Sequence, residues 1–183
     1  LDRTGELDLV IQMLENKVNT PLTSSCGRLF DGISALAGVC SEINYHGQAA
    51  IELENTITQK SDEKYTMYLD SDNDGLIIKY DKLIKEVVED VIGGVPTEKI
   101  AIKFHNSLTE VLLDTALNIR QNRNLNKIVL SGGVFMNMYL LDRLEKLLRQ
   151  RNFDVYWHKK VPTNDGGISL GQAVIADAKT RNS

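Results

Sequence analysis

The chain has 183 residues and a formal net charge of −4. This length suits one domain with a core of its own, and 42% apolar with 25% charged residues is ordinary for a globular protein. The acidic balance argues against nucleic acid as the main partner. No apolar run approaches the roughly 18 residues that a membrane span needs, and a basic start with an apolar core, typical of a signal peptide, is absent.

The two cysteines, Cys26 and Cys40, lie in apolar-periodic sequence and have no CxxC spacing. Small buried thiols in a reducing compartment are therefore favoured over a disulfide, and we expect a cytoplasmic protein. The sequence begins with Leu1 rather than Met, so we expect either a processed terminus or a piece of a longer chain.

The first third of the chain predicts three helices, at about residues 5–20, 23–39 and 47–59. The first carries apolar residues at helical spacing. The second begins with a Thr-Ser-Ser capping cluster and can end at Gly38. Residues expected on the inward faces of the second and third helices are Leu29, Phe30, Ile33, Leu36, Ala37, Ala49, Ala50, Leu53 and Ile57.

The period changes over residues 64–80, where apolar residues alternate on both sides of the turn-rich "DSDNDG". This pattern predicts a β-hairpin. The turn also has the spacing of a calcium loop, with Asp70, Asp72, Asp74, Gly75 and Asp81 at ligand or glycine positions. An EF-hand needs a helix before its loop, and residues 65–69 indicate a strand, so the hairpin is favoured over the calcium site.

The second half predicts helices at residues 81–94 and 97–122, then strand 127–131, helix 136–151, strand 153–158 and helix 167–178. On the long helix, His105 has apolar neighbours, and a satisfied, partly buried histidine is favoured over a ligand or base. Edge packing is the default interpretation of Trp157 and His158. The pattern gives no Ser-His-Asp or Cys-His arrangement for a nucleophilic mechanism.

Each strand of this alternation leads into a glycine pair, Gly132-Gly133 and Gly166-Gly167. Glycines permit a tight path, and the first amides of a helix suit phosphate or another anion, although packing alone explains one such step equally well. Adjacent parallel strands would bring both steps to one edge of the sheet, which favours a ligand site. Asp165 at the second step can cap the helix, which is the role that spacing alone favours, or serve as an oxygen ligand to a metal.

The blocks "PLTSSCGRLFDGISALAGV", "YHGQAAIELE", "LSGGVFMN" and "VPTNDGGISLGQAVIA" closely resemble the C-terminal region of the HypF family, the carbamoyltransferases of NiFe-hydrogenase maturation. The resemblance runs from about residue 19 to 176 and is weaker over 57–94. That region is similar to the TsaD family of tRNA threonylcarbamoyl transferases. The resemblance therefore implies a helix-rich α/β fold, one lobe of an actin-like ATPase (ASKHA) fold, with residues 1–183 as the C-terminal lobe of the TsaD-like domain.

The resemblance also implies a nucleotide site for ATP or carbamoyl-adenylate. The positions matching the family's site are Asp31, Gly47, Gln48, Glu52, Gly132, Gly133, Asn137 and Gly166. In the TsaD relatives, the residues matching Asp31 and Glu52 contact the ribose, whose vicinal hydroxyls donate to carboxylates. Without the resemblance, both acids would be taken as exposed helix charges. Gln48 stands where TsaD relatives have a glycine.

Asp165 matches the last ligand of the family's divalent metal, zinc or iron. The remaining family ligands, a histidine pair and an aspartate, have no match here, since His46, His105 and His158 are isolated. The chain would thus hold half of a cleft. Alone it is expected to be inactive, and the remaining HypF domains are expected as its partners.

The implied function is part of a carbamoyltransferase. It would use carbamoyl-adenylate, made from carbamoyl phosphate and ATP, to carbamoylate the C-terminal cysteine of HypE. The alternative is a non-catalytic nucleotide-binding or assembly module that docks on a missing partner half. A third reading, a TsaD-like enzyme acting on tRNA, is disfavoured by the sequence pI of about 5.4.

Overall fold

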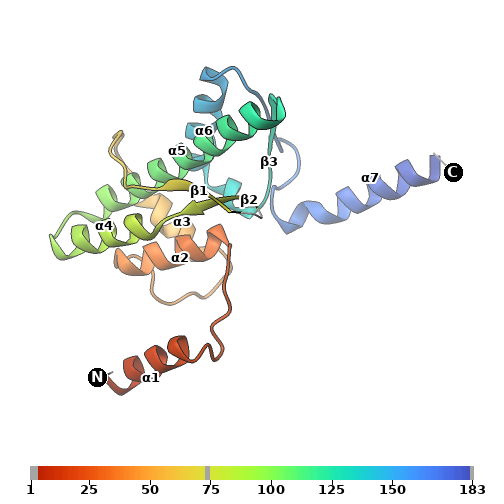
Figure 1. Ribbon diagram of the computed structural model, residues 1–183. Coiled ribbons are helices and arrows are strands. Elements are labelled where there is room, and N and C mark those ends of the chain that lie inside the picture. The colour runs from red at the N-terminus through yellow and green to blue at the C-terminus, as the bar shows by residue number, and fades with distance from the viewer. Residues whose placement is uncertain (1–3, 73–74, 182–183) are drawn as a thin grey trace.

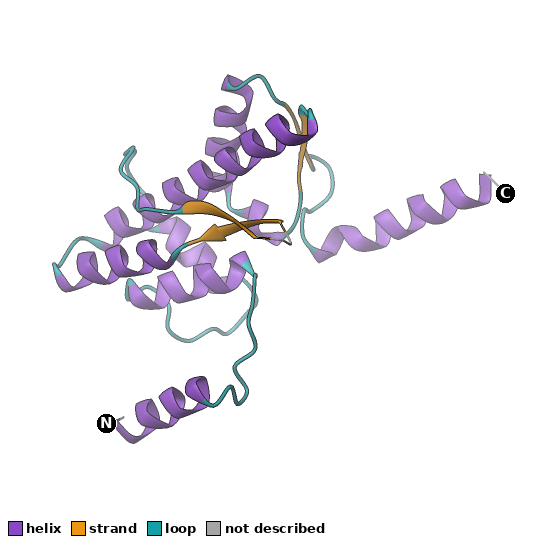
Figure 2. Ribbon diagram, viewed as in Figure 1, coloured by secondary structure: helices purple, strands orange, loops and turns teal. Residues whose placement is uncertain are grey.

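The computed structural model describes the backbone of residues 4–72 and 75–181. Helices dominate this part of the chain, and two separate two-stranded sheets interrupt them (Figure 1, Figure 2). The first elements are α1 (Thr4–Glu15), α2 (Cys26–Leu36), α3 (Gln48–Asn55), β1 (Tyr68–Asp72), β2 (Gly75–Lys79) and α4 (Asp81–Ile92). The others are α5 (Thr97–Arg123), β3 (Lys127–Leu130), the 3₁₀ turn η1 (Gly133–Met136), α6 (Met138–Gln150), β4 (Asp154–Trp157), the 3₁₀ turn η2 (Asp165–Gly167) and α7 (Ile168–Arg181).

Helix α2 begins and ends where its capping residues predict. The Ser25 side chain accepts a hydrogen bond from the backbone N–H of Arg28. At the other end, Gly38 has a left-handed φ of 71°, and the N–H of Val39 donates to the carbonyl of Ser34 at 2.9 Å. This is a Schellman motif, and it confirms that Gly38 closes the helix.

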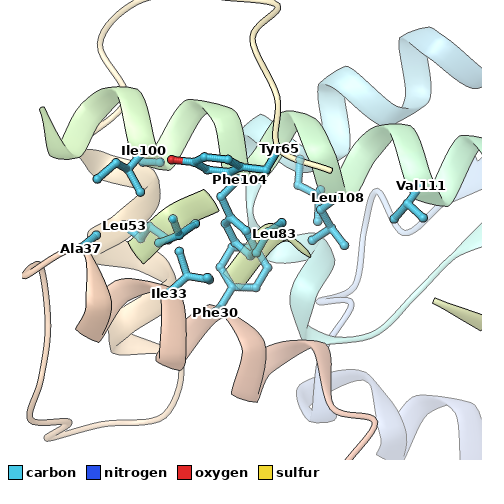
Figure 3. Close-up of a cluster of buried hydrophobic side chains, with 13 residues drawn as sticks. Phe30, Ile33, Ala37, Leu53, Tyr65, Leu83, Ile100, Phe104, Leu108 and Val111 are labelled. Carbon is cyan, nitrogen blue, oxygen red and sulfur yellow. The ribbon is translucent and has the colours of Figure 1, made fainter. Parts of the chain in front are cut away.

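The main core lies among α2, α3, α4 and α5 and is capped by the hairpin (Figure 3). The rings of Phe30 and Phe104 meet edge to face, with centroids 4.8 Å apart. Two details differ from the sequence expectation. Leu36 is exposed rather than inward, and α3 ends at Asn55 rather than near residue 59, although Ile57 still packs against the core. The buried cluster comprises Phe30, Ile33, Ala37, Leu53, Tyr65, Leu83, Val87, Ile100, Ala101, Phe104, Leu108, Val111 and Leu140.

The predicted hairpin is confirmed. Strands β1 and β2 pair antiparallel, with Tyr68 opposite Lys79 and Asp72 opposite Gly75. A strand therefore precedes the acidic turn where an EF-hand needs a helix, so the EF-hand reading is wrong. Calcium binding itself stays untested, and Asp74 of the proposed loop lies outside the described residues.

The second sheet is the parallel pair β3 and β4, in which Val129 lies opposite Tyr156 and Leu130 opposite Trp157. Helix α6 and the C-terminal part of α5 cover one face of this sheet. On the other face, Val129 and Tyr156 are 69% and 53% exposed. Because parallel strands are normally covered on both faces, this face lacks a layer in the chain by itself. The covered face is built from Leu113, Leu130, Leu141, Leu144, Leu148, Phe153 and Val155.

The two terminal helices extend away from this body (Figure 1). The apolar period predicted for the first helix does form α1, but its apolar side chains are exposed, and those of α7 are exposed as well. None of the helices in the described ranges combines the length and the hydropathy that crossing a membrane requires. The exposed apolar residues of the terminal helices are Leu7, Leu9, Val10, Ile11, Leu14, Ile168, Leu170, Val174 and Ile175.

Candidate functional site

The two glycine steps lie together at the carboxyl edge of the parallel sheet. The N–H of Gly132, just after β3, donates to the carbonyl of Thr163 at 3.0 Å, in the segment that follows β4. A Cβ added at Gly133 would lie 3.8 Å from the Cβ of Asn164. The expectation that adjacent parallel strands bring both steps to one edge is therefore confirmed, and the ligand role of this edge stays a prediction.

Two of these glycines are required by the path of the backbone. Gly132 has φ 104°, where side chains are strained. A Cβ at Gly167 would lie 2.7 Å from the carbonyl oxygen of Pro162, a backbone atom that cannot move aside. Packing thus accounts for these two positions by itself. At Gly166 an added Cβ would lie 3.1 Å from Oδ1 of Asn164, so packing favours glycine there too. Gly133 has neither a left-handed φ nor such a close contact, and a close approach to a ligand is the more informative interpretation only at this position.

Asp165 occupies the position predicted for it, just before the final helix. Its alternative role as a cap is wrong, because the capping residue is Asn164, whose Oδ1 accepts from the N–H of Gly166 at 3.1 Å. Asp165 opens η2, and its side chain is exposed. Its carboxylate is consequently available to a partner from outside this chain.

Asn137 ends the first glycine segment, and its side chain is engaged inside the protein. It is buried, and its Oδ1 accepts from the N–H of Leu140 at 2.8 Å, which caps α6. Its Nδ2 lies 2.9 Å from Nε2 of His105. Asn137 therefore anchors the segment between the glycines and α6, while direct contact with a nucleotide stays a prediction.

His105 is satisfied, as expected, but it is fully rather than partly buried. Its Nδ1 lies 2.8 Å from the carbonyl oxygen of Ala101. Because a carbonyl only accepts, Nδ1 carries the proton and Nε2 accepts from Asn137. Burial lowers the pKa of His105 to about 4, so the ring is neutral near pH 7.

The acids that the resemblance assigns to the ribose lie on α2 and α3. On α3, Nε2 of Gln48 donates to Oε1 of Glu52 at 2.7 Å, while the N–H of Asn44 donates to Oε1 of Gln48 at 2.7 Å. This fixes the Gln48 side chain that replaces the glycine of TsaD relatives. Gly47 immediately before it has φ 81°, a left-handed value that suits glycine at the start of this helix.

On α2, Asp31 forms an ion pair with Arg28 at 2.8 Å. The guanidinium of Arg28 faces Oδ2 of Asp31, the buried oxygen of this carboxylate, so Asp31 is already engaged inside the chain. Contact between Asp31 and a ribose stays a prediction.

Asp31 and Glu52 converge on the buried thiol of Cys40. Burial raises the pKa of Cys40, and the nearby carboxylates of Glu52 and Asp31 raise it further. The two acids, 21 positions apart in the sequence, therefore lie in one neighbourhood. Both cysteines are free thiols; Cys40 is buried, as expected, whereas Cys26 is only partly buried. Burial raises the pKa of Cys26 to about 11.

The acid pair and the glycine steps are joined through the core. The ring of Phe30, next to Asp31, meets the ring of His105 with centroids 5.3 Å apart. The carboxylate of Glu54 on α3 accepts from the N–H of Tyr139 at the start of α6, at 2.9 Å. The elements that carry the candidate nucleotide residues are thus connected by direct contacts.

One pair at the sheet edge was missed by the sequence reasoning. Oγ of Ser131 lies 3.2 Å from Nε2 of His158, and both residues are exposed. The signal was the strand register: because Leu130 pairs with Trp157, the residues that follow them are neighbours. The pair lies beside the first glycine step, where a polar ligand would meet it.

The described residues do not provide a complete metal site. No cluster of three or more histidine, cysteine, aspartate or glutamate side chains in these ranges has the geometry to hold a metal ion. Divalent ions require several donors, so the metal implied by the resemblance does not fit this chain alone. The role of Asp165 as a ligand to such an ion stays a prediction.

Comparison with known proteins decides the family. The family model described as "Carbamoyltransferase, Kae1-like Domain, second subdomain" matches residues 2–172. The chain belongs to the HypF carbamoyltransferase family. It is 37% identical over 163 residues to the carbamoyltransferase HypF of Synechocystis sp.. The matched region is 88% of this chain and 20% of that protein. The HypF-family chain thus spans about a fifth of the length of this relative.

Two further comparisons place the fold. A crystal structure of full-length HypF in the phosphate- and nucleotide-bound form superposes with a TM-score of 0.89 at 43% identity, covering 96% of this chain and 23% of that one. A tRNA N6-adenosine threonylcarbamoyltransferase of Thermosipho africanus is 39% identical over 62 residues, 34% of this chain and 19% of that protein. The expected fold is confirmed: the HypF-family chain is a helix-rich α/β lobe of the actin-like ATPase type.

Proposed function

We propose that residues 1–183 are the C-terminal lobe of the TsaD-like domain of a HypF-type carbamoyltransferase. The complete protein would make carbamoyl-adenylate from carbamoyl phosphate and ATP. It would then transfer the carbamoyl group to the C-terminal cysteine of HypE during NiFe-hydrogenase maturation. The single observation that carries this proposal is the meeting of both glycine steps at one sheet edge, in a chain that belongs to the HypF family.

The proposed nucleotide site has two walls. At the sheet edge, the backbone at Gly132, Gly133 and Gly166 would approach the phosphates, with Asn137 holding the end of the segment. On the helical side, the residues proposed for the sugar are Asp31, Gly47, Gln48 and Glu52. The placement of the two carboxylates on the packed helices α2 and α3 supports this, because ribose hydroxyls donate to carboxylates. The similar HypF structure was obtained in a phosphate- and nucleotide-bound form, which also supports it.

The transfer step requires positioning more than reactive side chains. The sulfur of the acceptor cysteine, as thiolate, would attack the carbamoyl carbon and form the C–S bond. The bond between that carbon and the phosphate oxygen would break, and AMP would leave with the electron pair. The loop backbone would contribute by holding the phosphate in line with the acceptor. Asp165 is proposed as the one ligand that this lobe gives to a divalent zinc or iron ion.

The remaining domains of a HypF protein are the proposed partner of the uncovered surfaces. The open sheet face at Val129 and Tyr156 and the apolar sides of α1 and α7 need a covering layer. An open apolar pocket of about 270 Å³, lined among others by Ile119, Leu125 and Phe153, lies between α5 and the covered face of the sheet, so it is distinct from the open face. We propose a cytoplasmic location, in line with the two free thiols.

A second candidate is a non-catalytic nucleotide-binding or assembly module. The incomplete set of metal-binding side chains in the described ranges favours it for the chain by itself. A carbamoyl-transfer assay separates the two candidates, with the chain alone and with the chain joined to the remaining HypF domains. Transfer that appears only in the joined protein, and that Asp31→Ala weakens, supports the enzyme. A joined protein that binds ATP but never carbamoylates the acceptor supports the assembly module.

A further inference from the structure

His105 is a polar ring in the middle of an apolar core. It is fully buried on α5, and it meets the rings of Phe30, Phe104 and Tyr139 edge to face, with centroids 5.3, 5.6 and 5.4 Å away. These rings come from α2, α5 and α6. A buried imidazole is costly unless both nitrogens are bonded, and a phenylalanine would fill the same place without that cost. Packing alone does not account for a histidine here.

The hydrogen bonds of His105 run into the first glycine segment. The carbonyl of Ala101 accepts a hydrogen bond from Nδ1–H, which leaves Nε2 as the acceptor for the Nδ2–H of Asn137. Asn137 Oδ1 is occupied by the N–H of Leu140, so its amide has one orientation that satisfies both ends. His105 therefore selects the side-chain conformation of Asn137, the residue at which the chain leaves η1 and enters α6.

We propose that His105 is a positioning residue that, as the neutral Nδ1–H tautomer, holds Asn137 and thereby the whole segment 131–137 in its observed conformation. His105 would act on a bound nucleotide only through this segment, and that consequence rests on the proposed function. The positioning itself does not, because it is a property of the hydrogen bonds within this chain. The ring contact with Phe30 ties the same histidine to the helix that carries Asp31.

Amide hydrogen exchange on the chain with His105→Phe tests the proposal. The variant keeps a ring among the aromatic neighbours but gives Asn137 no acceptor. The N–H groups of Phe135 and Asn137, which bond to the carbonyls of Gly132 and Val134, should exchange about tenfold faster relative to the amides of α4. Unchanged relative exchange in the folded variant would overturn the proposal.

Thr109→Val is the matched control. Thr109 is also fully buried on α5, but its hydroxyl donates only to the carbonyl of Asn106 on the same helix. It should leave the relative exchange of the segment unchanged. If it accelerates the segment as much as His105→Phe does, the effect is a general loosening of α5 and the proposal fails.

Asn137→Ser removes the donor of the same hydrogen bond and tests the proposal if the His105→Phe variant does not fold. Serine keeps an oxygen that can cap α6 and removes the amide that donates to His105. The segment should again exchange about tenfold faster, with the amides of α6 protected as before. In the wild type, the ¹⁵N spectrum of His105 at pH 7 should show Nδ1 protonated. An Nε2–H tautomer would contradict the assigned direction of the bond.

Calorimetry with ATP on the full-length protein distinguishes a failure of the positioning role from a failure of the proposed nucleotide site. If His105→Phe loosens the segment and the wild type binds no ATP, the positioning role stands and the nucleotide site fails. If the wild type binds ATP and the segment does not respond to His105→Phe, the nucleotide site stands and the positioning role fails. If the positioning role and the nucleotide site are both correct, His105→Phe should weaken ATP binding more than Thr109→Val does.

Discussion

The helical body and the parallel sheet with the following helix α7 differ in how much of their apolar surface this chain covers by itself. Around Phe104, residues from α2 to α5 are buried on every side (Figure 3). The parallel sheet is covered on one face, and α7 exposes Leu170 and its apolar neighbours. The helical body is therefore held by its own burial, whereas the sheet carries the candidate site at an edge that needs a neighbour.

Matched leucine truncations measure this difference most directly. Leu53→Ala in the helical core, where the side chain is fully buried, should lower the free energy of unfolding by about 2–5 kcal/mol. Leu170→Ala in α7 should change it by less than about 0.5 kcal/mol, because the side chain is half exposed. Urea denaturation of both variants gives the two values. Equal losses would mean that α7 is packed in this chain and that the comparison is wrong.

A pH titration of stability probes the polar centre of the helical body. His105 has a pKa of about 4 in the folded chain, against about 6.5 unfolded, so the unfolded state binds the proton first. Its contribution is fully present above pH 6.5 and is lost as the pH falls toward 4, a total of about 3 kcal/mol. His105→Phe should flatten this part of the profile. A profile that is flat between pH 6.5 and 5 in the wild type would refute the buried neutral ring.

The sequence predicted most of the helical body and less of the sheet edge, for physical reasons. Caps such as Ser25 and Gly38 act within a few residues, so α2 was predictable. The glycine steps were found because strand, turn and helix follow each other locally. The bond between His105 and Asn137 joins positions 32 apart, and only tertiary packing brings them together.

Residue spacing alone did not predict other features of the candidate site. Asn164 and Asp165 are both good capping residues, and the path of the turn gives the role to Asn164. The contact between Ser131 and His158 required the register of β3 and β4. The apolar period of α1 predicted a helix correctly, but periodicity does not say whether the covering layer belongs to the same chain.

One substitution on each wall of the proposed nucleotide site tests whether both walls contribute to ATP binding. Asp31→Ala and Asn137→Ala should each weaken ATP binding by the full-length protein by about 1–3 kcal/mol, the range for losing a hydrogen bond to a charged or buried group. Asn137→Ala should also lower stability by more than about 1 kcal/mol, because it removes the cap of α6 and leaves Nε2 of the buried His105 without its donor. Isothermal calorimetry gives the affinities. Unchanged affinity in both variants would reject the site.

The smallest expected effect is that of calcium on the hairpin. Strand β1 replaces the helix that an EF-hand needs, so millimolar calcium should leave the melting temperature unchanged. Asp70→Ala should behave like the wild type in the same thermal scan. A calcium-dependent rise that Asp70→Ala removes would show a real site in the turn.

The central claim is that the sheet edge of this lobe takes part in carbamoyl transfer, and Asp165 tests it most directly. Asp165 is exposed at that edge, beside the segment that binds Gly132, and it caps nothing, so its removal should leave the fold intact. In the full-length protein, Asp165→Ala should abolish carbamoylation of the acceptor cysteine and leave the formation of carbamoyl-adenylate unchanged. Both activities are measured on the same preparation. Retained carbamoylation would contradict the account.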